Sequence, residues 1–552
     1  MLVTEEKTSA SKKTFFSGVA VLTLSVVLVK IIGLLYKIPM LKYLGTEGMA
    51  FFNAAYDIYT MFYMISTAGL PVAVSIMISE NRVRGNAKNV KKIYRTALAL
   101  FFVIGTAGML AMMLGSGQFA ALIKMDEAAY CIFAIAPTLF FVCISSAMRG
   151  FFQGYQIMTP TAVSQVIEAL GKLVIGLLMA RWAMKNGYSL PVAASFAVLG
   201  LTVGVAVSFI YITISKILFR LTGKQARLTV DEGLSADSTS SVLGGLVKIA
   251  IPITISSSVM GIARLVDTAM ISSRLQTIGY AGNVANSLYG AYSTMVVPIY
   301  SLPPALITGI SLSLVPMLTA AVEAGNREKE SMVLSSSLRI CTLFAMPCAI
   351  GLCFFSKPIL ELLFSHEKDS VEIASPLLSI LGISVLFACL MTVTNAILQA
   401  YKQERKPIIS MAIGAFLKIV FDYILIGVPA LNIYGAPIST FICNAAVMTL
   451  NFVFIKKYAS EFDGIAKLFY KPFAASVLSV GTAFALYTAI RLKIGPSRLF
   501  TFLAVALGAL LYFFFALLFG AADGDDVKML PGGKVLFRIL SKIGFFKNNM
   551  TK

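Results

Sequence analysis

Charged side chains inside long apolar runs are the residues of this chain that could do chemistry. Three pairs of opposite charge are spaced three or four residues apart: Glu168 with Lys172, Lys418 with Asp422, and Arg264 with Asp267. This spacing places both members of a pair on one face of a helix. Ionisable groups are costly inside a membrane, so they pair or face water. Each pair therefore predicts either mutual neutralisation or a position on the wall of a hydrated cavity.

Three further charges are not part of these closely spaced pairs. Lys30 has no acid three or four residues away, and Asp57 has no base at these distances. Neighbouring antiparallel helices would bring the two to similar depth, which predicts a Lys30–Asp57 ion pair. The alternative is that Lys30 faces the cavity and holds an anionic group. Arg149 ends an apolar run, where it either reaches out to lipid phosphate or guards the mouth of the cavity, and we favour the first.

The balance of these charges favours an anionic ligand. The bases are Lys30, Arg149, Lys172, Arg264 and Lys418, and the acids are Asp57, Glu168, Asp267 and Asp422. A cation exporter would more naturally carry an excess of acids. A slightly basic cavity instead suits an anionic group such as a pyrophosphate.

The residue types do not predict catalysis or a resident cofactor. The chain has one His, His366, and no P-loop consensus, so we expect neither a His-based catalytic or metal site nor direct use of ATP. The seven Cys fall in apolar runs without paired metal spacing, which predicts reduced core thiols. The basic residues lie between apolar runs, so we read the net charge of +20 as membrane-side anchoring and expect no nucleic-acid partner.

The elements that must position these charges are membrane helices. The chain of 552 residues is 58% hydrophobic and 13% charged, with a mean hydropathy of +0.84. Many runs reach the ~20 residues that cross a bilayer, which predicts an all-α polytopic membrane protein with about 14 spans. We place these at 14–38, 49–76, 93–115, 128–149, 160–182, 190–216, 244–272, 287–320, 335–356, 373–400, 408–428, 433–456, 470–491 and 498–520. Four prolines predict a kink or break in 287–320, and Pro71, Pro137, Pro252 and Pro347 predict milder kinks.

An internal repeat relates the two halves of the chain. Residues 141–172 and 387–418 share Phe, Cys, Gln, Tyr and Lys at equal offsets, and each copy turns through a link with a Pro (Pro160, Pro407). Repeated halves in a membrane protein indicate a transporter whose site lies between them. The repeat would set Lys172 and Lys418 across from one another. It also makes its paired glutamines, Gln153 and Gln399, candidates for the cavity wall.

The repeat and the polar links predict the domain order. We expect a six-helix bundle at 1–225, a cytoplasmic linker at 226–243, a second six-helix bundle at 244–460, two extra spans within 461–520 and a basic cytoplasmic tail at 521–552. The distribution of Lys and Arg predicts that both termini are cytoplasmic, with Arg491, Lys493 and Arg498 as exceptions on the outer side. The tail is either an amphipathic helix on the inner leaflet or loosely ordered. Small-residue steps such as GLTVG at 200–204 predict close helix packing.

Several segments resemble one family. RGFFQGYQIMTPTAVSQVIEALGKLV (149–174), the opening region 33–80 and RLVDTAMISSRL (264–275) are similar to the stage V sporulation protein B group, within the multidrug/oligosaccharidyl-lipid/polysaccharide flippase superfamily. The resemblance implies a MATE-like pair of six-helix bundles with two extra C-terminal helices. It also implies alternating access for a lipid-linked sugar, with its headgroup in a central cavity and its polyprenyl tail in the membrane.

The resemblance and the charges together predict a flippase in the bacterial cell membrane for a polyprenyl-pyrophosphate-linked saccharide or peptidoglycan-type precursor. Expected partners are this substrate, membrane lipids and enzymes of envelope glycan synthesis. Two alternatives stay open: a cation-coupled MATE-type exporter that uses Asp57 or Asp267, and a non-transporting scaffold of a glycan-synthesis complex.

Overall fold

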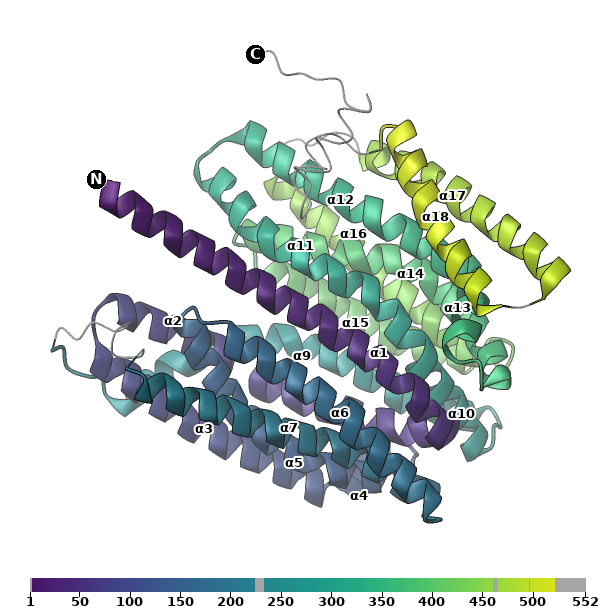
Figure 1. Cartoon of the computed structure of the whole chain (residues 1–552), viewed down its shortest axis with the longest axis horizontal. Helices are drawn as coiled ribbons and strands as arrows, with labels where there is room; N and C mark the ends of the chain where they lie inside the picture. The colour runs from purple at the N-terminus through teal and green to yellow at the C-terminus, as the bar shows by residue number, and fades with distance from the viewer. Residues whose placement is uncertain (1, 224–232, 460–464, 496, 522–552) are drawn as a thin grey trace. The chain divides into compact units, whose positions relative to one another are not determined.

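The computed structural model describes residues 2–223, 233–459, 465–495 and 497–521, and the regular structure in these ranges is helical, with no strand (Figure 1). The all-α class predicted from the sequence is therefore confirmed. The chain packs as two compact units, residues 1–294 and 295–552. The basic tail and most of the predicted linker lie outside the described residues. The predicted bundle boundaries stay a prediction.

The first unit contains helices from both sides of the predicted linker. Its helices are α1 (Leu2–Thr67), α2 (Leu70–Val83), α3 (Ala87–Leu114), α4 (Ser116–Leu122), α5 (Ala129–Gly154), α6 (Thr159–Lys185), α7 (Leu190–Leu221), α9 (Thr239–Thr277) and α10 (Gly282–Ala291). Helices α6 and α7 form one tight pair, and α5 packs on α3 and α7. Helices α9 and α10 pack against α1, so residues far apart in the sequence meet on α1.

The second unit begins at Met295, within a short π-helical turn. That turn covers Tyr292–Val296 and leads into α11 (Val297–Glu323), α12 (Arg327–Phe354), α13 (Ser356–Leu363), α14 (Lys368–Ala400), α15 (Arg405–Ile426), α16 (Gly435–Tyr458), α17 (Ile465–Ile494) and α18 (Arg498–Leu518). Helix α16 packs on both α14 and α15, which carry the second copy of the repeat. Helices α17 and α18 lie side by side as a hairpin that packs through α17 on α12 (Figure 1).

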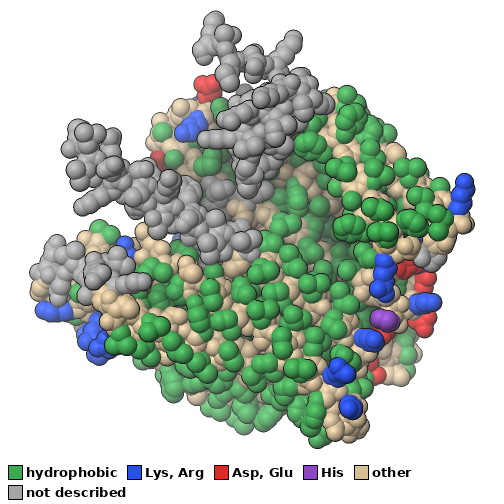
Figure 2. All heavy atoms as spheres, in the orientation of Figure 1, with side chains coloured by type: hydrophobic (Ala, Val, Ile, Leu, Met, Phe, Trp, Pro, Cys, Tyr) green, Lys and Arg blue, Asp and Glu red, His purple; other side chains and the backbone are tan. Residues whose placement is uncertain are grey.

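The lengths and apolar character of these helices fit a membrane protein. Twelve segments of the described chain are long and apolar enough to cross a bilayer. The first, Ser25–Val83, has 59 residues, which is enough for two crossings. The predicted count of about 14 treats this segment as two spans and includes α9. Hydrophobic side chains cover most of the face seen in Figure 2, as a surface in contact with lipid requires.

Glycine and proline set the breaks in the first crossings. Gly45 has φ +62° and ψ −178°, values that lie outside the helical region and interrupt α1. A second break precedes Pro71, where a Cβ on Gly69 would lie 2.1 Å from the Ala250 carbonyl oxygen. Pro71 thus marks the start of a new helix, not the mild kink that we predicted. The second predicted span, 49–76, is accordingly split between α1 and α2.

Other prolines lie inside continuous helices. Helix α5 runs through Pro137, α9 through Pro252 and α12 through Pro347. In the predicted span 287–320 the α-helix is interrupted by the π-helical turn just before Pro298, and α11 then continues through the three later prolines. The one departure from regular α-helix in this stretch is thus the π-helical turn, and a kink at the prolines stays a prediction.

The cysteines behave as core residues. No disulfide joins those in the described chain, and all of them are buried or half-buried. This confirms the prediction that the thiols are reduced and packed among apolar side chains.

Paired glycines hold α6 and α7 together. A Cβ on Gly200 would lie 2.2 Å from the Cα of Gly176, and a Cβ on Gly171 would lie 2.4 Å from the Cα of Gly204. Only hydrogen fits at such distances, so the two backbones touch without intervening side chains. The close packing predicted from GLTVG is confirmed, and it fixes α6, which carries two of the charged site candidates.

We expect the substitution Gly200→Val to destabilise the first unit by about 1–3 kcal/mol, because the added methyl groups must push α6 from α7. The thermal unfolding midpoint of the purified protein measures this effect. Gly244→Val is the matched control, since Gly244 lies in α9 with nothing within 4 Å of its added Cβ. Equal midpoints for the two variants would contradict the close contact.

Candidate functional site

Lys172 lies among aromatic rings. Its ammonium nitrogen, on α6, is 4.4 Å from the ring centroid of Tyr56, 5.0 Å from that of Tyr36 and 5.3 Å from that of Phe52, all on α1. Ring faces attract a cation without neutralising it. The ion pairs of the described chain do not include the predicted Glu168–Lys172 pair. The Lys172 side chain therefore lies over ring faces of α1 and does not form the predicted ion pair with Glu168.

Glu168 is engaged by Arg149 instead. The Arg149 guanidinium lies 3.1 Å from the Glu168 carboxylate and also donates to Ser164 at 3.0 Å and to Ser208 at 3.4 Å. Arg149 is 6% exposed, so the expectation that it reaches lipid phosphate is wrong. The physical reason is that α5 continues to Gly154, which leaves Arg149 inside the bundle against α6 and α7.

Lys37 is a site residue that the sequence analysis did not select. Its ammonium donates to the Ser293 carbonyl oxygen at 2.8 Å and to the Asn53 side-chain oxygen at 3.2 Å. The Asn53 amide in turn donates to the hydroxyls of Ser293 at 3.0 Å and Thr294 at 2.7 Å. The predicted first span, 14–38, contains Lys37 one residue before its end, but Lys37 was not among the candidate site residues. The available signal was its spacing of two helical turns from Lys30.

Asp57 is held by hydroxyl groups, not by Lys30. Its carboxylate accepts hydrogen bonds from Thr268 of α9 at 2.8 Å and from Tyr289 of α10 at 3.1 Å. Lys30 is exposed, and the ion pairs of the described residues do not include it. The predicted Lys30–Asp57 pair is therefore wrong. Sequence spacing could not reveal that α9 and α10 pack on α1 and bring these hydroxyls to the carboxylate.

The pairing of Arg264 with Asp267 on α9 stays a prediction. Arg264 is exposed, while Asp267 is half-buried. Arg264 nevertheless lies within electrostatic range of two cations of α1, Lys30 and Lys37. Lys172 and Asp57 also lie within electrostatic range of Lys37. We call Lys30, Lys37, Lys172 and Arg264 the cationic cluster; Asp57 is the acid in range of its central member.

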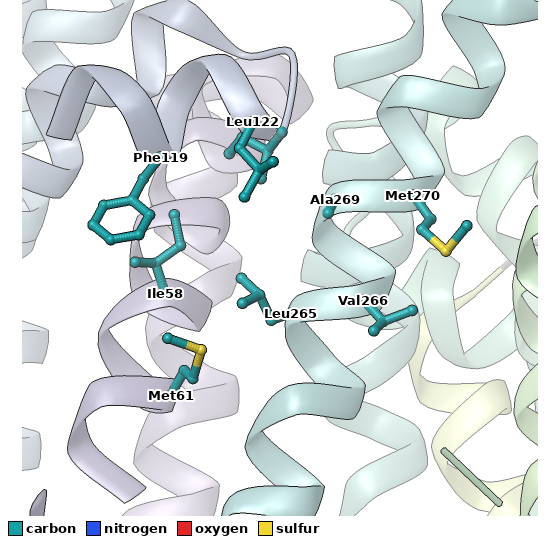
Figure 3. A pocket seen from close by; sticks show the side chains of 9 residues that line it. Ile58, Met61, Phe119, Leu122, Leu265, Val266, Ala269 and Met270 are labelled. Atoms are coloured by element: carbon teal, nitrogen blue, oxygen red, sulfur yellow. The ribbon is translucent and has the colours of Figure 1, made fainter. Parts of the chain in front are cut away.

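An apolar cavity lies close to this cluster. It has a volume of about 320 Å³ and is enclosed by α1, α4 and α9 (Figure 3). Its lining residues are Ile58, Met61, Phe119, Leu122, Ile123, Leu265, Val266, Ala269 and Met270. Ile58 follows Asp57 in the chain, and Leu265 follows Arg264. The first unit therefore offers charged and apolar surface next to each other, as an amphiphilic ligand requires.

Sequence comparison identifies the family. The model of the Lipid II flippase MurJ family matches residues 40–508, which is most of the chain. The chain belongs to the MurJ family.

Relatives and a solved structure agree with this placement. Lipid II flippase MurJ of Bacillus subtilis (strain 168) is 26% identical over 459 residues, covering 80% of this chain and 82% of that protein. Stage V sporulation protein B of the same organism is 23% identical over 430 residues, which cover 78% of this chain and 81% of that protein. A solved structure of lipid II flippase MurJ in an inward closed conformation matches with a TM-score of 0.69 at 17% identity. The match covers 90% of this chain and 98% of that structure's chain. The predicted resemblance and fold are thus confirmed.

The internal repeat of this MurJ-family chain extends to the backbone. After α5, the Gln156 amide donates to the Gln153 carbonyl at 2.8 Å, and after α14 the Lys402 amide donates to the Gln399 carbonyl at 2.9 Å. Gln156 and Lys402 have φ of +61° and +58°, so both turns end their helix through a left-handed residue. The Gln153 side chain is half-buried and that of Gln399 is exposed. Substrate binding by either glutamine stays a prediction.

The two repeated lysines have different surroundings. Lys418 is 4% exposed, lies 3.5 Å from Asp422 and donates to Thr440 at 2.8 Å. Asp422 is fully buried and also accepts a hydrogen bond from Ser439. The predicted pair of α15 is confirmed, and its charges are matched within the second unit. In this MurJ-family chain, Lys418 is thus matched by an acid, whereas Lys37 and Lys172 of the first unit are held by neutral groups.

We expect the single variant Arg149→Gln to lose about 3 kcal/mol of unfolding free energy, because Glu168 is left without its partner. This is the lower end for buried pairs, since 25% of the Glu168 side chain is exposed. The double variant R149Q/E168Q should be more stable than R149Q in thermal unfolding of the purified protein. Lys402→Gln is the control, because its pair with Glu323 is exposed and contributes at most about 1 kcal/mol. A double variant less stable than R149Q would contradict the assignment.

Proposed function

We propose that this chain is a flippase that moves an anionic lipid-linked saccharide, such as a polyprenyl-pyrophosphate-linked precursor of peptidoglycan or another surface glycan, across the bacterial cell membrane. The observation that carries the proposal is the cationic cluster of the first unit. Its central residue, Lys37, has three other cations and one acid within electrostatic range. A net positive site inside membrane helices is stabilised by an anionic ligand.

The way in which the cations are held supports this proposal. Lys37 contacts a carbonyl and an amide oxygen, and Lys172 contacts ring faces. None of these partners carries a negative charge. An arriving phosphate can therefore take hydrogen bonds from both ammonium groups without breaking an ion pair. By contrast, Lys418 could bind an anion only by giving up its contact with Asp422.

Lys30 and Arg264 complete the proposed phosphate site. Both are exposed although they lie within apolar helices. A charge in such a position is retained where water reaches it. We propose that the two side chains attract the headgroup from a hydrated space, and that Lys37 and Lys172 then bind it. The neighbouring apolar cavity gives the site a surface for the adjoining hydrocarbon.

The same proposal includes the setting in the cell. Both termini lie in the cytoplasm, where the basic loops concentrate anionic lipid at the entrance by about 1 kcal/mol for each nearby charge. The two halves alternate access to the substrate without any bond being broken. Enzymes that make the lipid-linked precursor are the partners expected on the cytoplasmic side.

We expect cells that depend on the variant K37Q/K172Q to export the precursor at least ~10-fold more slowly, because two charge-assisted hydrogen bonds to phosphate are lost. Lipid-linked precursor should accumulate in the inner leaflet, where an externally added headgroup-cleaving enzyme cannot reach it. The charge-preserving variant K37R/K172R should retain most of the export. Equal protein levels in the membrane must accompany the comparison.

The matched control is Lys216→Gln. Lys216 is also a lysine within a span that lies over an aromatic ring, 3.6 Å from the centroid of Phe151, but it is not part of the cationic cluster. Export should be unchanged in this variant. Normal export by K37Q/K172Q, in a strain without a second transporter, would overturn the proposed function.

A further inference from the structure

A second cavity lies in the second unit, where the hairpin of α17 and α18 meets α13 and α14. Its volume is about 390 Å³, and its lining includes Glu361, Ser365, Lys368, Glu372, Tyr487 and Arg498. This size falls in the lower part of the range of small-molecule sites. The cavity is distinct from the cationic cluster, which consists of residues of the first unit.

The acids of this cavity are already matched. Glu361 accepts from Arg491 at 3.0 Å, and Glu372 forms an ion pair with Lys357. These two bases do not line the cavity. The ion pairs of the described second unit do not include Lys368 or Arg498.

Arg498 is held in place by a neutral group. Its guanidinium donates to the hydroxyl of Ser365. A guanidinium that is positioned by one hydroxyl keeps further donors for an anion. Together with Lys368, it gives the cavity two cations whose charges are not cancelled by an ion pair, and therefore a preference for an anionic ligand.

The cavity lies where two candidate spans end. Helix α17 ends at Ile494 and α18 begins at Arg498, so the turn between them marks a membrane surface. Leu499 is 63% exposed and Phe502 is 64% exposed, as expected of side chains that face lipid. Figure 2 shows acidic and basic side chains gathered around the single His of the chain at this edge of the molecule. Polar headgroups and hydrocarbon thus both lie within reach of the cavity.

We infer that this cavity binds the phosphate group of a lipid, with Arg498 and Lys368 as its ligands and the hydrocarbon of the lipid along the exposed face of α18. The planar guanidinium matches two phosphate oxygens, and the ammonium adds a point charge. The distribution of Lys and Arg predicts that Arg491 and Arg498 lie on the outer side of the membrane, where basic residues are otherwise few. The proposed site gives both residues a role on that side. Arg491 neutralises an acid of the cavity, and Arg498 binds the ligand. This inference does not depend on the proposed transport function.

The experiment is a binding assay with the full chain in detergent, using native mass spectrometry to count bound probe molecules. The probes are dihexanoyl-phosphatidylglycerol, which represents membrane phospholipid, and farnesyl pyrophosphate, which represents a polyprenyl carrier. All proteins in the assay carry K37Q/K172Q, so that the cationic cluster does not contribute. We expect at least one probe to bind and the additional variant R498Q/K368Q to weaken its binding at least ~10-fold. R498K should restore part of the affinity.

The matched control is K402Q/R405Q, which removes the same charge from the exposed link between α14 and α15. Its binding should equal that of the parent protein. Binding of the phosphatidylglycerol probe alone identifies a phospholipid site, and binding of the farnesyl probe alone identifies a carrier-lipid site. The inference is overturned if neither probe binds, or if R498Q/K368Q has an unchanged melting temperature and binds as the parent does.

Discussion

The cost of placing a charge inside a membrane is the constraint on which this structure depends. Lipid offers no hydrogen bonds, so each ionised group in a span must find a partner in the protein or water. The chain uses several kinds of partner. Arg149 and Lys418 are matched by acids, Lys37 by a carbonyl and an amide oxygen, and Lys172 by ring faces. Only the last two arrangements leave the lysine without a carboxylate partner.

This difference gives the two copies of the repeat separate roles. Lys172 and Lys418 have the same position in their repeats, and the turns before their helices share the same backbone hydrogen bond. An acid one helical turn away accompanies each lysine, yet only Asp422 pairs with its lysine. Arg149 on the neighbouring helix binds Glu168 and thereby releases Lys172. In the first repeat the acid thus pairs with an arginine from another helix, and in the second it pairs with the repeated lysine.

Predictions from the sequence were right where the cause was local. Runs of apolar residues predicted the helices because crossing a bilayer requires about 20 of them. The i,i+4 spacing predicted the Lys418–Asp422 pair because one helix carries both partners. The contacts of Asp57 could not be predicted in this way, since Thr268 and Tyr289 come from helices more than 200 residues away. Arg149 was placed wrongly for a related reason: one additional helical turn moves it from the membrane surface into the bundle.

Irregular backbone shapes the proposed binding site. The π-helical turn at Tyr292–Val296 contains Ser293, whose carbonyl oxygen accepts from Lys37 instead of serving only the helix. Just beyond the break at Gly45, a Cβ on Gly290 would lie 1.8 Å from the Thr46 carbonyl oxygen, so α10 approaches α1 closely enough for this contact. Such backbone is tolerated at membrane depth only where protein groups or water satisfy it. The same departures from regular helix that blurred the predicted span boundaries thus accompany the contacts of Lys37 and Asn53 with the π-helical turn and those of Asp57 with α9 and α10. A regular helix through Tyr292–Val296 would keep the Ser293 carbonyl within its own hydrogen bonds and leave Lys37 with Asn53 as its remaining neutral partner.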